Sequence, residues 1–95
     1  PGSIINAQAH IGDSCIINSG SIVEHECQIG GFVHLAPRAI LCGNVKVGSG
    51  SFIGAGAVIK QGVKIGSNVT VGAGAVVIND ILDNTKVVGN PSKNI

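Results

Sequence analysis

Two histidines and two glutamates lie close together in a sequence that is otherwise poor in ionisable groups. The run is Val23-Glu24-His25-Glu26-Cys27-Gln28-Ile29-Gly30, and His34 follows His25 by nine residues. A histidine exchanges protons near neutral pH, and an adjacent carboxylate can fix its tautomer and raise its basicity. These residue types at this spacing make His25 a candidate general base and Glu26 a candidate for the carboxylate that tunes it.

A repeat of six residues fills the rest of the chain and would position these side chains. A large aliphatic residue recurs at every sixth position, at Ile5, Ile11, Ile17, Val23, Ile29, Leu35, Leu41, Val47, Ile53, Ile59, Ile65, Val71 and Val77. Four residues after each comes a second, mostly small residue, for example Ala9, Cys15 and Ser21. A period of six fits neither a helix nor a plain strand, and hexapeptide repeats are typical of a parallel β-helix.

The repeat predicts an all-β chain that forms one domain over residues 1–95. A triangular coil of three hexapeptides uses eighteen residues, so residues eighteen apart should stack at about the 4.8 Å spacing of neighbouring strands. The repeats extend over residues 5–82 in about five coils, and residues 83–95 would form a C-terminal cap. Gly or Asn directly follows many of the large aliphatic residues, as in Gly12 and Asn6, and we expect these residues to adopt turn dihedrals.

The eighteen-residue register brings particular residues into shared columns. Gly43 should lie one coil beyond His25, so that a backbone N–H with no side chain in its way stands beside the imidazole as an oxyanion donor for acyl transfer. His34 is half a coil away from His25, at a different corner of the same chain. Across a trimer interface, the His25 corner of one chain could face the His34 corner of the next. Pro37, Ala55 and Ala73 form a column beside His34 that leaves room for an extended ligand.

Composition excludes several classes of partner and compartment. A formal net charge of +1 gives no field suited to nucleic acid or to an anionic membrane. No signal-peptide pattern or membrane-length apolar run is present, and three cysteines without paired spacing fit a reducing compartment, so we expect a cytoplasmic protein. The thin aliphatic core, with two Phe and no Trp, Tyr or Met, favours a self-templating fold or partner subunits.

The motifs resemble those of the hexapeptide-repeat acyltransferases. The resemblance is carried by Glu-His-Glu-Cys with Ile29-Gly30, by Phe32 and His34, by the run from Gly43 to Gly48, and by the closing run from Val87 to Lys93. Within that superfamily the chain is similar to the family of sialic acid O-acetyltransferases and UDP-4-amino-sugar N-acetyltransferases, including the bacillosamine pathway enzyme. The resemblance implies a left-handed β-helix, a homotrimer with active sites between subunits, and acetyl-CoA as acyl donor without a metal.

The same resemblance implies the role of each site residue. His25 would be the general base and Glu26 the carboxylate that raises its basicity. His34, Gly43, Ala55 and Ala73 would bind acetyl-CoA, with the Gly43 amide near the thioester carbonyl. The acceptor would be an amine or hydroxyl of a sugar, either a nucleotide-linked amino sugar or a sialic acid.

The sequence departs from the family in one feature, and two functions other than acetyl transfer stay open from the sequence alone. The family usually carries an N-terminal nucleotide-sugar-binding domain, and the 95 residues contain no βαβ pattern of that kind. A γ-class carbonic anhydrase shares the fold and binds zinc through three histidines, but the spacings of His10, His25 and His34 do not match its ligands. The other alternative is a non-catalytic trimeric scaffold.

Overall fold

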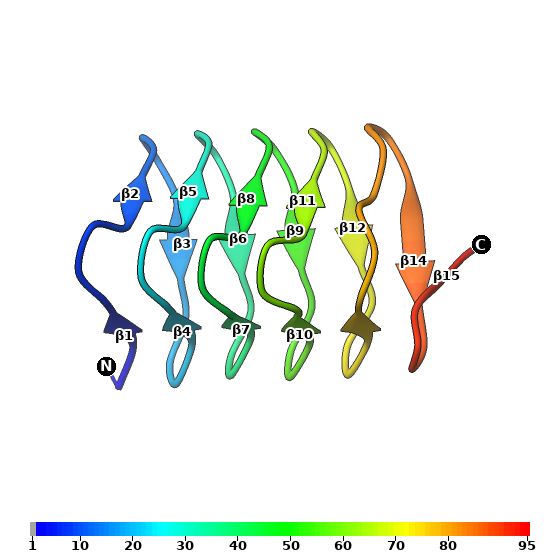
Figure 1. The fold of residues 1–95 in the computed structure, drawn as a ribbon, viewed down its shortest axis with the longest axis horizontal. Helices are drawn as coiled ribbons and strands as arrows, with labels where there is room; N and C mark the ends of the chain where they lie inside the picture. Colours follow the sequence, from blue (N-terminus) through cyan, green and yellow to red (C-terminus); the bar gives the residue numbers. More distant parts are fainter. Residues whose placement is uncertain (1) are drawn as a thin grey trace.

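The chain winds into a triangular prism whose three sides are parallel β-sheets. The computed structural model describes residues 2–95, and Figure 1 shows the coils advancing along the long axis of the molecule. Sheet A contains β1 (Ile4–Ile5), β4 (Ile22–Val23), β7 (Ile40–Leu41), β10 (Val58–Ile59) and β13 (Val76–Val77). Sheet B contains β2 (His10–Ile11), β5 (Gln28–Ile29), β8 (Lys46–Val47) and β11 (Lys64–Ile65). Sheet C contains β3 (Ile16–Ile17), β6 (His34–Leu35), β9 (Phe52–Ile53), β12 (Thr70–Val71), β14 (Lys86–Val88) and β15 (Lys93–Asn94).

The register between coils is eighteen residues, as the repeat predicts. Val23 pairs with Leu41 in sheet A, and Ile29 pairs with Val47 in sheet B. In Figure 1 the near strands of sheet B run upward and the more distant strands of sheet C run downward while the coils advance from left to right, which is a left-handed screw. The all-β fold of about five coils is therefore confirmed, and among residues 2–95 no helix is long and apolar enough to cross a membrane.

Two side chains of each hexapeptide fill the interior. The large aliphatic residues at the ends of the strands are buried in the central coils, where Val23, Leu41 and Ile59 are fully inaccessible to solvent. The second, smaller residue is also buried, as at Cys27, Val45 and Ala57. Where this residue is serine, its hydroxyl donates to a backbone carbonyl, for example Ser21 Oγ to Ala36 O at 2.9 Å. The interior is thus a stack of like side chains on like side chains.

The corners between the sheets are two-residue turns of uniform geometry. We name them by the sheets that they join: the A–B corner (turn residues 7–8, 25–26, 43–44 and 61–62), the B–C corner (13–14, 31–32, 49–50 and 67–68) and the C–A corner (19–20, 37–38, 55–56 and 73–74). At each corner the second turn residue has a positive φ, whether it is Gly56 at 69°, Asn44 at 59° or Glu26 at 60°. This conformation has little steric cost for glycine and is strained for residues with a Cβ.

The sequence-based interpretation of the other glycines was wrong. Gly12, Gly48 and Gly54, which directly follow the large aliphatic residues, are not among the residues with positive φ. They are needed because successive coils approach each other closely there: a Cβ added to Gly48 would lie 2.6 Å from the backbone of Gly66. Close contact between backbones, and not a special dihedral angle, therefore excludes a side chain at these positions.

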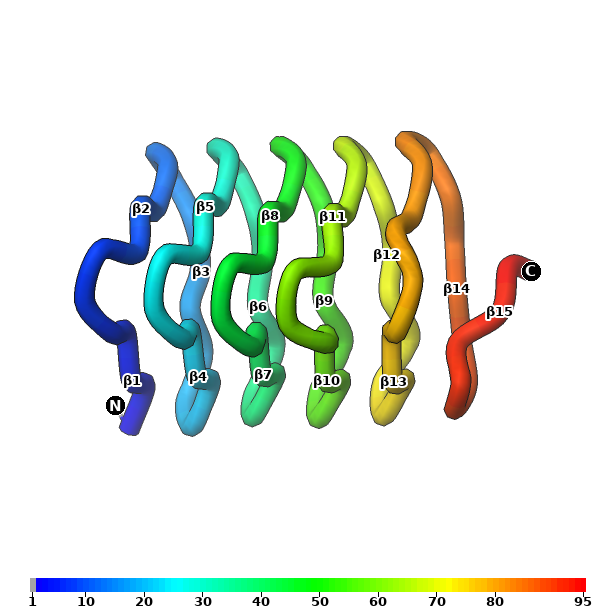
Figure 2. The backbone as a smooth tube through the Cα atoms, in the orientation of Figure 1, coloured from blue at the N-terminus to red at the C-terminus, as the bar shows by residue number. Residues whose placement is uncertain are grey.

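The two ends of the prism differ. Past β13 the register shortens, since Ile81 pairs with Ile65 and Val87 with Val71, but sheets B and C continue. The chain then reverses, and β15 pairs antiparallel to β14 at the C-terminal end (Figure 2). At the N-terminal end of the described residues, Ile5 in β1 is half exposed at 50%.

Candidate active site

His25 and Glu26 are the two turn residues of the A–B corner in the second coil. Their side chains are 55% and 54% exposed, and His25 Nδ1 lies 3.4 Å from Glu26 Oε1. This contact is slightly longer than a hydrogen bond, and catalytic hydrogen bonds are often loose before substrate binds. A carboxylate on Nδ1 favours the tautomer in which Nε2 is the free, basic nitrogen. The pair predicted from sequence is therefore assembled within one turn.

Glu26 is held in a left-handed backbone conformation beside the imidazole. Glu26 has a φ of 60°, in the left-handed region that a residue with a Cβ adopts at a cost of about 1–2 kcal/mol. In the same column the other coils carry Gln8, Asn44 and Gly62. Residues held in such conformations cluster at functional sites, where the strain is part of how a side chain is positioned.

Gly43 lies directly beyond His25, as the eighteen-residue register predicts. A Cβ added to Gly43 would be 2.8 Å from His25 Cε1 and 2.9 Å from Nε2, so the ring covers the place where a side chain would be. The two neighbours of Gly43 donate to the adjacent coils, Cys42 N to Ile59 O and Asn44 N to His25 O, both at 3.0 Å. Any larger residue at position 43 would displace the imidazole.

The N–H of Gly43 has no hydrogen-bond partner within residues 2–95. The first turn residue of the other described corners also lacks a backbone acceptor, but those residues are partly or fully exposed, whereas Gly43 is buried beneath His25. A buried N–H without an acceptor is costly and rare. A donor of this kind beside a basic nitrogen is suited to a developing oxyanion.

His34 is the first residue of β6 and lies on the outer side of sheet C, not at a corner as the sequence suggested. Its Nε2 lies 2.8 Å from Asn18 Nδ2, and its ring packs edge-on against Phe52 with centroids 4.9 Å apart. When the Asn18 amide donates to Nε2, the proton of neutral His34 is on Nδ1, which leaves Nδ1 as a donor. Asn18 was missed from the sequence, although it stands sixteen residues before His34, at the end of the strand one coil earlier.

Ala55 and Ala73 are the first turn residues of the C–A corner in the third and fourth coils. Both are exposed and stack above Pro37, and Gly74 N donates to Ala55 O at 2.8 Å. Their side chains are short, so little projects from this corner in these two coils. The structure therefore divides the predicted site residues into two groups, with His25, Glu26 and Gly43 at the A–B corner and His34, Ala55 and Ala73 on sheet C and the C–A corner.

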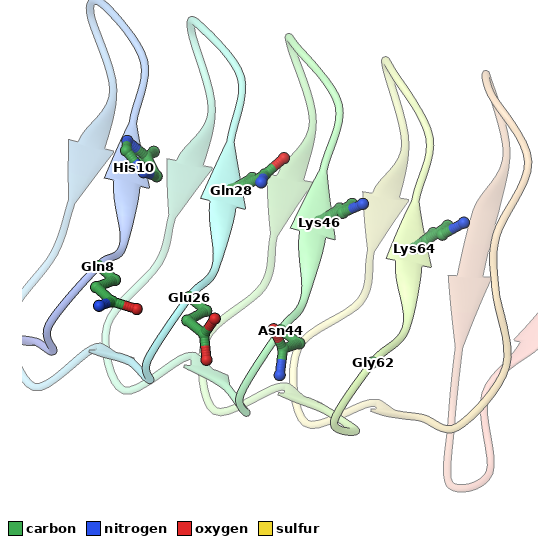
Figure 3. A pocket seen from close by; sticks show the side chains of 8 residues that line it. All are labelled: Gln8, His10, Glu26, Gln28, Asn44, Lys46, Gly62 and Lys64. Carbon is green, nitrogen blue, oxygen red and sulfur yellow. The ribbon is translucent and has the colours of Figure 1, made fainter.

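A polar groove of about 530 Å³ runs along sheet B beside Glu26. Figure 3 shows Lys46 and Lys64 projecting from successive strands, with Glu26 and Asn44 on the turns below them. The outward residues of sheet B are all polar, while the corresponding residues of sheet A are all aliphatic. His10 also lies on sheet B, in β2, and lines the same groove one coil before Gln28.

The remaining nucleophiles and possible metal ligands do not form a second centre. The three cysteines are free, and burial raises the pKa of the Cys27 thiol, which keeps it protonated and unreactive. His10, His25 and His34 lie on sheet B, the A–B corner and sheet C. Within residues 2–95 no three His, Cys, Asp or Glu side chains are grouped to hold a metal ion.

Comparison with known proteins identifies what this geometry resembles. The sequence model of the family described as bacterial transferase hexapeptide (six repeats) matches residues 26–61 and 44–79. PerB from Caulobacter crescentus, solved in complex with CoA and GDP-perosamine, is 45% identical, with a TM-score of 0.98 over 99% of this chain and 45% of that protein. A search of curated proteins gives no match.

Two further solved structures share the fold. The acetyltransferase domain of PglB from Neisseria gonorrhoeae, in complex with acetyl coenzyme A, is 39% identical, with a TM-score of 0.87 over 100% of this chain and 52% of that one. A maltose O-acetyltransferase from Clostridium difficile is 33% identical, with a TM-score of 0.87 over 98% of this chain and 64% of that one. The chain spans about half the length of the first two proteins.

Proposed function

This chain belongs to the bacterial hexapeptide-repeat transferase family, and we propose that it transfers an acetyl group from acetyl-CoA to an amine or hydroxyl of a sugar. The observation that carries the proposal is the buried N–H of Gly43 beneath the exposed imidazole of His25, because this pairs a base with an oxyanion donor. The similarity to PerB, solved with CoA and a nucleotide-linked sugar, supports a nucleotide-linked amino sugar as the acceptor.

The proposed reaction is a direct transfer. His25 Nε2 takes the proton of the acceptor amine or hydroxyl while that nitrogen or oxygen forms a bond to the thioester carbon. The negative charge that develops on the carbonyl oxygen is stabilised by the Gly43 N–H. The carbon–sulfur bond then breaks, CoA leaves as the thiolate, and the proton held by His25 can neutralise it. Glu26 stabilises the imidazolium that forms between these steps.

The site requires a second copy of the chain. His34, Ala55 and Ala73 lie on sheet C and the C–A corner, away from the A–B corner that holds His25 and Gly43. In a homotrimer the A–B corner of one subunit would face the C–A corner of the next, so that the donor lies between them. His34 of the second subunit would contact the donor, and Ala55 and Ala73 would leave space for its extended arm.

Compartment and domain organisation follow from the same proposal. We place the enzyme in the cytoplasm, where acetyl-CoA is made and where three unpaired cysteines are stable. Residues 1–95 act as one catalytic β-helix, with the repeats over residues 5–82 and the C-terminal cap over residues 83–95.

Calorimetry with acetyl-CoA tests the proposal directly. We expect saturable binding at about one site per chain in a trimer. His34→Ala should weaken binding, whereas His10→Ala, on sheet B, should leave it unchanged and serves as the control. His25→Ala should still bind acetyl-CoA but release CoA thiol about 10²- to 10⁴-fold more slowly when GDP-perosamine is added. If the native protein does not bind acetyl-CoA, or binds zinc stoichiometrically, the acetyltransferase proposal is wrong.

Mixed trimers test whether the site lies between subunits. His25→Ala and His34→Ala chains should each be inactive alone. When they are unfolded together and refolded in equal amounts, about one quarter of the native activity should return, because one site in four combines an intact His25 with an intact His34 of the neighbour. If both histidines act within one chain, the mixture stays inactive.

A further inference from the structure

Arg38 occupies a position where the fold favours glycine. It is the second turn residue of the C–A corner in the second coil, with a φ of 62°. The other members of its column are Gly20, Gly56 and Gly74, all with positive φ. The corner forms without any side chain in three coils, so the strained arginine contributes nothing that the turn needs. Other corners also hold non-glycine residues in this conformation, such as Gln8 and Phe32, but within its own column Arg38 is the one residue with a side chain. Residues held in such conformations cluster at functional sites.

The arginine side chain extends towards the N-terminal end of the prism. A Cβ added to Gly20, one coil earlier, would lie 3.1 Å from Arg38 Cγ, whereas a Cβ added to Gly56, one coil later, would meet nothing within 4 Å. Arg38 N donates to Ser19 O at 3.0 Å, which keeps the turn against the first coil. The side chain therefore points away from Ala55 and Ala73, along which the donor is proposed to extend.

The positive charge of Arg38 is unpaired within the described part of the chain. Arg38 is exposed, it is the sole arginine of the sequence, and the ion-pair contact found in residues 2–95 joins His25 to Glu26 instead. The guanidinium group has a planar fork of donors that matches phosphate and carboxylate oxygens, and it keeps its charge at all physiological pH values. Its natural ligand is a negatively charged group with two oxygens.

Arg38 and His25 belong to the same coil, and the proposed trimer brings their corners together across the subunit interface. The donor approaches this level from the C-terminal coils, since Gly43, Ala55 and Ala73 all lie beyond it. The acceptor must therefore enter from the side of the first coil, where the Arg38 side chain lies. This step rests on the proposed acetyl transfer.

We propose that Arg38 binds the anionic group of the acceptor and so selects phosphate- or carboxylate-bearing sugars. The group would be the diphosphate of a nucleotide-linked sugar or the carboxylate of a sialic acid, because both present the paired oxygens that a guanidinium recognises. Arg38 would hold the far end of the acceptor while its amine or hydroxyl reaches His25 of the neighbouring subunit. It is a specificity-determining residue and takes no part in proton transfer.

Steady-state kinetics of the native protein, Arg38→Gly and Arg38→Lys test this role. With GDP-perosamine as acceptor, Arg38→Gly should raise the acceptor KM by about 10- to 100-fold, the loss expected for a charged hydrogen-bonded contact. The KM for acetyl-CoA and its affinity by calorimetry should not change. Arg38→Lys should recover part of the loss, because it restores the charge without the fork. N-acetylneuraminic acid as a second acceptor distinguishes a carboxylate from a phosphate as the recognised group.

Each alternative gives a different result. Equal acceptor KM values for native protein and Arg38→Gly, with both acceptors, would overturn the role of Arg38 and leave the acetyl transfer intact. A change confined to acetyl-CoA affinity would assign Arg38 to the donor instead and overturn the proposal. A loss of trimer, measured by light scattering, with an unchanged acceptor KM would make it an interface residue. No turnover by the native protein with either acceptor, despite binding of acetyl-CoA, would remove the proposed function together with this role.

Discussion

The interior columns and the corner columns of this β-helix differ in how much they vary from coil to coil. In sheet A the inward column reads Val23, Leu41, Ile59 and Val77, all fully buried aliphatic residues. At the A–B corner, the column that contains His25 also contains Ala7, Gly43 and Gln61, which share no chemistry. The interior of every coil meets the same packing requirement, while the corners have only to turn. The difference teaches that stability and chemistry are carried by separate positions of one hexapeptide.

The largest expected effect is on catalysis at the corner. Replacing His25 by Ala should lower the transfer rate by about 10²- to 10⁴-fold, the usual contribution of a positioned base. The free energy of unfolding should change by less than about 0.5 kcal/mol, because the side chain is exposed. Rates and urea unfolding of His25→Ala and of the control His10→Ala provide the measurement. A clear loss of stability in His25→Ala would show that corner and interior are not separate.

The opposite result is expected in the interior. Leu41→Ala removes a fully buried side chain between Val23 and Ile59 and should lower the free energy of unfolding by about 2–5 kcal/mol. The whole free energy of unfolding of a domain is about 5–15 kcal/mol, so this loss would be a large share of it. The adjacent, outward-facing Ile40 provides the control, and Ile40→Ala should cost much less in the same urea titration. Equal losses at the two positions would contradict the assignment of the interior.

Gly48 and Gly74 test the two physical requirements for glycine, which are close approach of the next backbone and a positive φ. In Gly48→Ala the new Cβ would meet the Gly66 backbone at 2.6 Å, and such overpacking costs about 1–3 kcal/mol. In Gly74→Ala the Cβ meets nothing within 4 Å, but a φ of 70° must be kept, at a cost of about 1 kcal/mol. Thermal unfolding of both variants should therefore rank Gly48→Ala as the less stable. The reverse ranking would mean that the coils can separate to admit a side chain.

The smallest expected effect is an increase in the free energy of unfolding, and not a loss. Arg38→Gly and Glu26→Gly each remove a side chain from a left-handed turn position, and each should stabilise the protein by about 0.5–1 kcal/mol. The gain is smaller than the strain itself, because glycine also makes the unfolded chain more flexible. Urea unfolding of the two variants measures it, and Gly56→Arg should show the converse loss. Unchanged stability in all three would mean that these turns hold no strain.

Most of the fold could be predicted because each element of the pattern depends on one local requirement. The six-residue period followed from the inward positions, and the eighteen-residue register followed from three hexapeptides per turn. The register alone placed Gly43 beside His25, and the structure confirms this. The handedness could not be derived from spacing and came from the resemblance to a known family.

The parts that could not be predicted depend on contacts between coils. Gly48 looked like a turn residue, since the sequence does not show that the next backbone would lie 2.6 Å from its Cβ. The strained residues Glu26 and Arg38 carry no local signal, because a left-handed turn position is usually marked by Gly or Asn. Asn18 was missed because its partner His34 lies one coil away on sheet C.

The stacked register makes a chain of residues 1–95 behave as a one-dimensional polymer of coils. Each coil is stabilised mainly by its nearest neighbours, so the free energy of opening depends on how many neighbouring coils it has. Ile5 is 50% exposed where Val23, directly above it, is fully buried, while β15 pairs with β14 at the opposite end. In these 95 residues alone, amide exchange should therefore be fastest in β1, β2 and β3. The coil that carries His25 then lies at the boundary between the rapidly and the slowly exchanging parts of the solenoid.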